Sequence, residues 1–121
     1  MSELYVFGKY QWDIDKAQEI LKQVPRPTHK VPVKALTSTL GLVHIDPAHA
    51  LTVDLTIPVI LGWIYVNSNW HQILIDGNHR AYRARQLKKK TLPAYILTKE
   101  ENYQILRGLS KKNSTLKKLI F

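Results

Sequence analysis

Cysteine is absent from this 121-residue chain, and long apolar runs are scarce. Without cysteine the protein cannot form a disulfide, a thiolate zinc site or a thiol nucleophile, and its composition suits a reducing compartment. The longest apolar run, residues 57–65, contains a proline and a glycine and is far too short to cross a bilayer. The first eight residues lack the basic and apolar parts of a signal peptide, so we expect a cytoplasmic protein without a membrane span.

Acidic residues are rare in the last third of the chain. The formal net charge is +9, and residues 80–121 hold twelve Lys or Arg against two Glu, a local balance of +10. Residues 1–79 hold six basic residues against seven acidic ones, a balance of −1. This asymmetry indicates a polyanionic partner, namely a nucleic acid, a nucleotide or an acidic membrane surface. A solvated basic surface that keeps the protein in solution explains the same charge.

Periodicity and turn residues predict an alternation of helices and strands. In the first half we expect a helix capped by Asp13 and ended by Pro25, a strand over 31–36, and a loop over 37–51 with one helical turn after Asp46-Pro47. A hairpin of strands 57–66 and 70–75 follows, and then a helix from Asn78 to about Lys88 and a strand over 91–97. The last elements are a helix over 99–109, opened by a capping box at 98–101, and a short helix after Ser114.

The stretch ILIDGNHR, residues 73–80, places an acid and a glycine between an apolar strand and a basic helix. A helix that begins directly after glycine offers uncapped N–H groups and a partial positive charge, which together stabilise a phosphate or carboxylate. The alternative explanation of these residues is a plain Asx-Gly turn followed by an exposed arginine.

The side chains at this turn are those that a phosphate site requires. Asn78 offers an amide, His79 can donate a hydrogen bond or shuttle a proton, and Arg80 can clasp phosphate oxygens. Asp76 can hold a magnesium ion or accept a proton from a substrate hydroxyl. We therefore predict Asp76 and His79 as catalytic candidates, Asp76 as the metal ligand, and Gly77, Asn78, His79 and Arg80 as the nucleotide cradle.

Residues 74–97, LIDGNHRAYRARQLKKKTLPAYIL, resemble the core of the ParB/sulfiredoxin-like family. In that family a strand leads to Asp-Gly-x-His-Arg, and an alanine-bearing helix, a basic turn and a proline-containing strand follow. VPVKAL at 31–36 and IPVIL at 57–61 resemble two of its earlier strands. The resemblance implies an α+β fold, a small mixed sheet with helices packed around it in a single domain. The expected organisation is an N-terminal helical extension over 1–27, the core over 28–98 and a basic C-terminal helical segment over 99–121.

The resemblance also implies a ligand. Sulfiredoxins carry their catalytic cysteine at the position of Asn78, so repair of cysteine sulfinic acid is excluded here. Gly77, His79 and Arg80 match family residues that hold nucleotide phosphates. The free serine kinases of the family place an aspartate at the position of Asp76 and need a further acidic base, while its partition proteins bind CTP. ATP or CTP with Mg²⁺ is thus the implied ligand, with phosphate hydrolysis or transfer as the implied reaction, and Asp46 or Asp54 is the candidate for the further base.

Two other classes of function fit the same sequence. One is a non-catalytic or nuclease-like accessory protein that binds DNA or RNA through Arg83, Arg85, Lys88, Lys89 and Lys90. The other is an interaction module whose ligand site has decayed. The amphipathic residues 114–121 would dock on the domain, pair two chains as a homodimer or touch a membrane surface.

Two further groups of residues have both a functional and a structural explanation. His44, Asp46 and His49 could form part of a metal site, or they lie in a polar loop. Trp63, Tyr65 and Trp70 could stack nucleobases, or they pack against one another across the strands of the hairpin.

Overall fold

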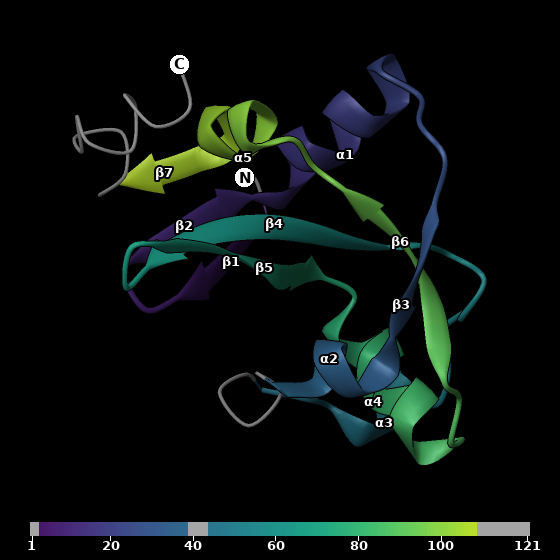
Figure 1. Ribbon diagram of the computed structural model, residues 1–121. Coiled ribbons are helices and arrows are strands. Elements are labelled where there is room, and N and C mark those ends of the chain that lie inside the picture. Colours follow the sequence, from purple (N-terminus) through teal and green to yellow (C-terminus); the bar gives the residue numbers. More distant parts are fainter. Residues whose placement is uncertain (1–2, 39–43, 109–121) are drawn as a thin grey trace. The chain divides into compact units, whose positions relative to one another are not determined.

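The computed structural model describes residues 3–38 and 44–108, which form the α+β fold expected from the sequence (Figure 1). The elements in chain order are β1 (Leu4–Phe7), β2 (Tyr10–Asp13), α1 (Ile14–Gln23), β3 (His29–Pro32), α2 (Val33–Leu36), α3 (Pro47–Ala50), β4 (Val59–Val66), β5 (Asn69–Asp76), α4 (Asn78–Gln86), β6 (Thr91–Ile96), α5 (Lys99–Ile105) and β7 (Leu106–Gly108). No helix within these residues is long and apolar enough to span a membrane.

The chain divides into two compact units. Among the described residues, unit 1 comprises 3–26, 62–73 and 97–108, and unit 2 comprises 27–38, 44–61 and 74–96. Strands β4 and β5 contribute residues to both units, because each strand crosses a unit boundary.

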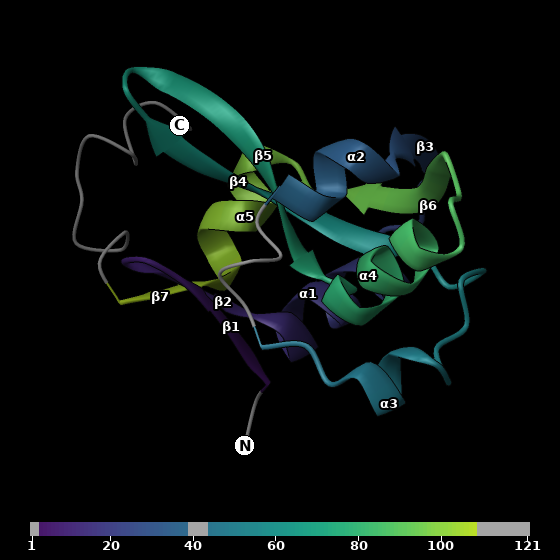
Figure 2. The same ribbon diagram turned by 90° about the horizontal axis from the view of Figure 1, so that it is seen from below.

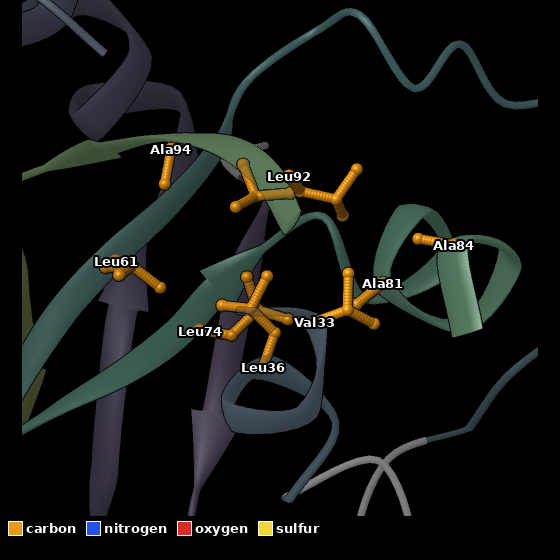
Figure 3. Close-up of a cluster of buried hydrophobic side chains, with 9 residues drawn as sticks. Val33, Leu36, Leu61, Leu74, Ala81, Ala84, Leu92 and Ala94 are labelled. Atoms are coloured by element: carbon orange, nitrogen blue, oxygen red, sulfur yellow. The ribbon is translucent and has the colours of Figure 1, made fainter. Parts of the chain in front are cut away.

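Unit 2 is built on a mixed sheet with the strand order β3-β6-β4-β5. Strand β3 runs antiparallel to β6 and strand β4 runs parallel to it, with His29 and Val59 both opposite Ala94. Figure 3 shows the apolar cluster of this unit, in which α2, α4 and the strands contribute side chains. Ala81 and Ala84 of α4 are fully buried there, and their small size lets the helix lie close to the sheet. The helix start that follows β5 is therefore fixed by the core.

Helices α2 and α3 both contact α4, and the views in Figures 1 and 2 place the three helices together. Val33 and Leu36 of α2 are buried three residues apart on one face. Asp46 caps α3 by accepting a hydrogen bond from the N–H of Ala48 at 3.0 Å. The segment around α3 is consequently brought to the first turn of α4.

Unit 1 holds a second sheet with the order β1-β2-β7, which is antiparallel throughout. The side chain of Asn102, on α5, is buried in this unit. Asn102 Oδ1 accepts hydrogen bonds from Trp12 Nε1 at 2.8 Å and from the N–H of Trp63 at 2.9 Å, and Asn102 Nδ2 donates to the carbonyl of Trp63 at 2.9 Å. One amide thus joins α5 to β2 and β4.

Most of the predicted elements are confirmed. Asp13 caps α1 by accepting from the N–H of Lys16 at 3.0 Å, the hairpin of β4 and β5 forms around Asn67-Ser68, and Thr98 and Glu101 form the predicted capping box. The single helical turn after Asp46-Pro47 is α3.

Three local predictions are wrong. Residues 33–36 form a helix rather than a strand, because burial of Val33 and Leu36 against α4 outweighs their β propensity. The helix from Lys99 ends at Ile105, since residues 106–108 pair with β2. The expected helical extension over 1–27 begins with the hairpin of β1 and β2. The helix expected after Ser114 lies outside the described residues.

Candidate functional site

The turn between β5 and α4 in unit 2 has a backbone that only glycine can adopt. Gly77 is the residue before the helix, with φ +108° and ψ +23°. A Cβ at this position would lie 2.4 Å from Val59 Cγ1 and 2.8 Å from Val59 Cβ. Since Val59 is fully buried on β4, the backbone of the turn lies directly against the sheet.

Helix α4 begins at this turn without a side-chain cap. The N–H of Ala81 donates to the carbonyl of Gly77 at 2.9 Å and opens the helical hydrogen-bond pattern. The N–H groups of the three preceding residues, 78–80, have no acceptor within the helix, and the helix dipole adds a partial positive charge there. The helix start therefore favours an anion.

Arg80 and Asp76 lie together at this helix start. Arg80 Nη2 is 3.5 Å from Asp76 Oδ2, and Arg80 Nη1 donates to the carbonyl of Ile57 at 3.3 Å. Both side chains are mostly buried, with 13% and 21% of their surface exposed. Because both contacts are long for hydrogen bonds, the guanidinium is held near the turn by weak bonds that a phosphate can replace.

Asp54, a candidate base, is an exposed residue whose carboxylate is already used within its own loop. Its Oδ1 accepts from the hydroxyl of Thr56 at 2.6 Å and from the N–H of Thr56 at 2.9 Å. These two bonds lower the pKa of Asp54, and the charge of Arg80 adds a smaller effect in the same direction. Asp54 is thus an ionised loop residue within the field of Arg80.

His79 points to the segment that precedes α3. Its Nε2 accepts a hydrogen bond from the N–H of Asp46 at 3.1 Å, which requires a neutral ring with its proton on Nδ1. The ring meets His49 edge to face, with 4.6 Å between ring centroids. Partial burial lowers the pKa of His79, and the neighbouring His49 and His44 lower it further against the opposing charge of Asp46.

The contact of His79 with the α3 segment was not predicted from the sequence. The two partners, Asp46 and His79, are 33 residues apart in the chain, and no spacing rule connects them. The sequence offers a metal site or a polar loop for His44 and His49, whereas in the structure His49 packs edge to face on His79 and both histidines lower the pKa of His79.

Asn78 has a buried polar atom without a partner. Its Oδ1 is shielded from solvent and accepts no hydrogen bond among the described residues. A buried carbonyl oxygen in this state costs about 1–3 kcal/mol, and such atoms are rare in folded proteins. A donor supplied by a ligand at the helix start would satisfy it.

The described residues contain no cluster of three or more His, Cys, Asp or Glu side chains that could hold a metal ion. The spacing of His44, Asp46 and His49 therefore does not build a metal centre by itself, and Asp46 caps α3 instead. Mg²⁺ commonly binds through one or two carboxylates when substrate phosphates complete its shell. Asp76 fits that kind of site, in which the ion arrives with its nucleotide.

Five further cations follow the turn, in the second half of α4 and just after its end at Gln86. Arg85, Lys88, Lys89 and Lys90 are exposed, while Arg83 is half-buried and bonded to Gln86. At a rise of about 1.5 Å per residue, Arg83 lies roughly 9 Å and Arg85 roughly 12 Å along the helix from Gly77. We call these five cations the basic flank; its three lysines lie beyond the end of the helix that starts at the turn.

Comparison of the chain with protein-family models, with curated proteins and with solved structures finds no match. The resemblance to the ParB/sulfiredoxin-like family consequently stays a prediction that rests on the residues of the motif.

Proposed function

We propose that the turn between β5 and α4 binds a nucleoside triphosphate together with Mg²⁺. The observation that carries the proposal is a glycine-dependent, uncapped helix start that lies beside Arg80 and the unpartnered Oδ1 of Asn78. Free N–H groups at a helix start and an arginine hold phosphates, whereas Asn78 Oδ1 can only accept a hydrogen bond from another part of the ligand. The family resemblance of residues 74–97 points to the same ligand.

The charges at the turn make magnesium part of the proposal. The helix dipole contributes roughly half a positive charge, and Arg80 adds a full one, but the carboxylate of Asp76 lies 3.5 Å from the guanidinium and offsets it. A bare triphosphate would be repelled by Asp76. A magnesium ion shared between this carboxylate and the phosphates converts the repulsion into attraction.

The side chains have different parts in this site. Gly77 gives the turn the backbone that starts α4 directly against Val59, and Arg80 exchanges its long bond with the carbonyl of Ile57 for phosphate oxygens. Asn78 Oδ1 accepts from a hydroxyl or amino group of the nucleotide. His79 already uses Nε2 to hold the α3 segment, so its part is positioning, and Asp76 acts in any hydrolysis or phosphate transfer by holding the magnesium ion.

Calorimetric titration with ATP and CTP, with and without Mg²⁺, tests the site. Arg80→Ala should weaken binding by roughly 10- to 150-fold, the range for a charge-assisted hydrogen bond. The matched control is Arg85→Ala, which removes an exposed arginine from the same helix and should leave the affinity unchanged.

Asp76→Asn tests the role of magnesium, because its effect on nucleotide affinity should have opposite signs with and without the metal. In Mg²⁺ the variant should bind the nucleotide more weakly, because a metal ligand is lost. Without Mg²⁺ it should bind more tightly than the natural protein, because the repelling carboxylate is gone. Unchanged affinity in Arg80→Ala, or no binding of either nucleotide by the natural protein, would contradict the proposal.

The basic flank supports a second candidate function, the binding of DNA or RNA phosphates. Four exposed cations fall within residues 85–90. Each phosphate contact changes the slope of log affinity against log salt by about 0.9. Replacing Lys88, Lys89 and Lys90 by Gln should therefore flatten the slope by nearly three if the flank lies on the nucleic acid. The homodimer expected through residues 114–121 involves a segment outside the described residues.

A further inference from the structure

Unit 1 carries a cluster of aromatic rings on the hairpin of β4 and β5. The two-residue turn has positive φ at Asn67 and Ser68, 53° and 63°, which is the geometry of a tight hairpin that sets Tyr65 opposite Trp70. Their ring centroids are 5.2 Å apart. Trp63 lies two residues before Tyr65 and so points to the same side of the strand. All three rings are half-buried.

A lysine lies over two of these rings. Lys99 Nζ, from the first turn of α5, is 5.2 Å from the ring centroid of Trp63 and 5.1 Å from that of Trp70. Because an ammonium group stays hydrated on one side, its position over both indoles places these half-buried rings at the surface of unit 1, where Lys99 covers them. We call Trp63, Tyr65, Trp70 and Lys99 the aromatic face.

The aromatic face differs from the aromatic core of the same unit. Trp12 is fully buried, stacks on Tyr10 with 5.5 Å between ring centroids, and donates its Nε1 proton to Asn102. Trp63 also has its polar edge satisfied, because Nε1 donates to the carbonyl of Leu97 at 2.7 Å. That bond fixes the ring, and one face of the ring lies under the ammonium of Lys99.

We propose that the aromatic face binds single-stranded nucleic acid. Bases would stack on the indole rings in the place now held by the ammonium of Lys99, and Lys99 would turn to a backbone phosphate. The ammonium of Lys99 over the two indole rings favours an anionic ligand over an apolar peptide, because the four residues of the face include a cation and no carboxylate. All four residues belong to unit 1, and the residues of the nucleotide turn belong to unit 2.

Fluorescence anisotropy of a labelled oligothymidylate of about 15 nucleotides, a length suited to such surfaces, tests the proposal on the full chain. Trp70→Ala should weaken binding by roughly 5- to 150-fold, the range for loss of one stacked base. Lys99→Gln should weaken it and flatten the salt dependence by about 0.7, the value for one single-strand phosphate contact. The matched control is His71→Ala, an exposed neighbour on the opposite side of β5, which should bind as the natural protein does.

The proposal is overturned if the natural protein does not bind the oligonucleotide, or if Trp70→Ala and Lys99→Gln both bind it unchanged. It is equally overturned if duplex DNA of the same length binds as tightly as the oligothymidylate and Trp70→Ala weakens the binding of neither. Circular dichroism establishes whether Trp70→Ala is folded. If it is not, Lys99→Gln decides, because glutamine keeps a long polar side chain at this half-buried position and the bond from Trp63 Nε1 to Leu97 still holds the Trp63 ring.

Discussion

Gly77→Ala is the substitution whose effect follows most directly from the structure. The added methyl group meets Val59 Cγ1 at 2.4 Å and Val59 Cβ at 2.8 Å, and real Cβ atoms do not approach other atoms so closely. Val59 is fully buried on the central part of the sheet, so it cannot move aside freely. The turn or the strand must shift, and the start of α4 shifts with it.

Two contributions set the magnitude. Placing a residue other than glycine in the left-handed region costs about 1–2 kcal/mol, and forcing an extra carbon into a packed site costs about 1–3 kcal/mol. We therefore expect the free energy of unfolding to fall by roughly 2–5 kcal/mol, a large part of the 5–15 kcal/mol typical of a domain. Binding of the nucleotide should be lost together with the geometry of the helix start.

Gly8→Ala is the matched control. Gly8 also has a positive φ, +59°, but a Cβ there would meet nothing within 4 Å. Its substitution should show the backbone contribution alone, about 1–2 kcal/mol. Urea unfolding followed by circular dichroism measures both variants, since all three tryptophans belong to unit 1 and would not report on the turn.

A double variant checks the steric cause. Val59→Ala removes the Cγ1 atom at 2.4 Å and leaves the Cβ atom at 2.8 Å, so it should partly relieve the clash. The loss of stability in Gly77→Ala/Val59→Ala should then be smaller than the sum of the two single losses. The reasoning is refuted if Gly77→Ala costs no more than Gly8→Ala, or if the double variant is simply additive.

Two further predictions concern other parts of the structure. Asn102→Ala leaves Trp12 Nε1 and the N–H of Trp63 without their acceptor, so urea unfolding should show a free energy of unfolding lower by about 3 kcal/mol. The control is Gln104→Ala, which replaces an exposed residue of the same helix. An equal loss of stability in the two variants would contradict the role of Asn102. The lowered pKa of His79 predicts full stability above its ordinary value of 6.5 and a decline as pH falls below it, because the unfolded chain takes up the proton first. His79→Gln should flatten this dependence in urea titrations across that range, and an unchanged slope would disprove it.

Local signals explain which parts of the fold were predictable. The caps at Asp13 and Thr98 and the hairpin turn at Asn67-Ser68 involve partners within a few residues, so the chain contains both halves of each interaction. Residues 33–36 were misassigned because their conformation depends on a distant helix. Strand β7 was missed for the same reason, since its partner β2 lies about 95 residues earlier.

The candidate site also has features that the local sequence predicts and features that depend on distant residues. The succession of strand, Asp-Gly and basic helix at residues 73–80 predicted an uncapped helix start, and this is what the structure has. The distance of Lys88, Lys89 and Lys90 from the turn also follows from the length of the helix between them.

Only the tertiary structure decided the surroundings of these residues. It placed Val59 beneath Gly77, the N–H of Asp46 on His79, and the ammonium of Lys99 over the rings of the hairpin. Local sequence determines dihedral preferences and hydrogen bonds between near neighbours, which act over a few residues. Close contacts between distant segments arise when the apolar side chains of the whole chain are buried together, and no short stretch contains that information.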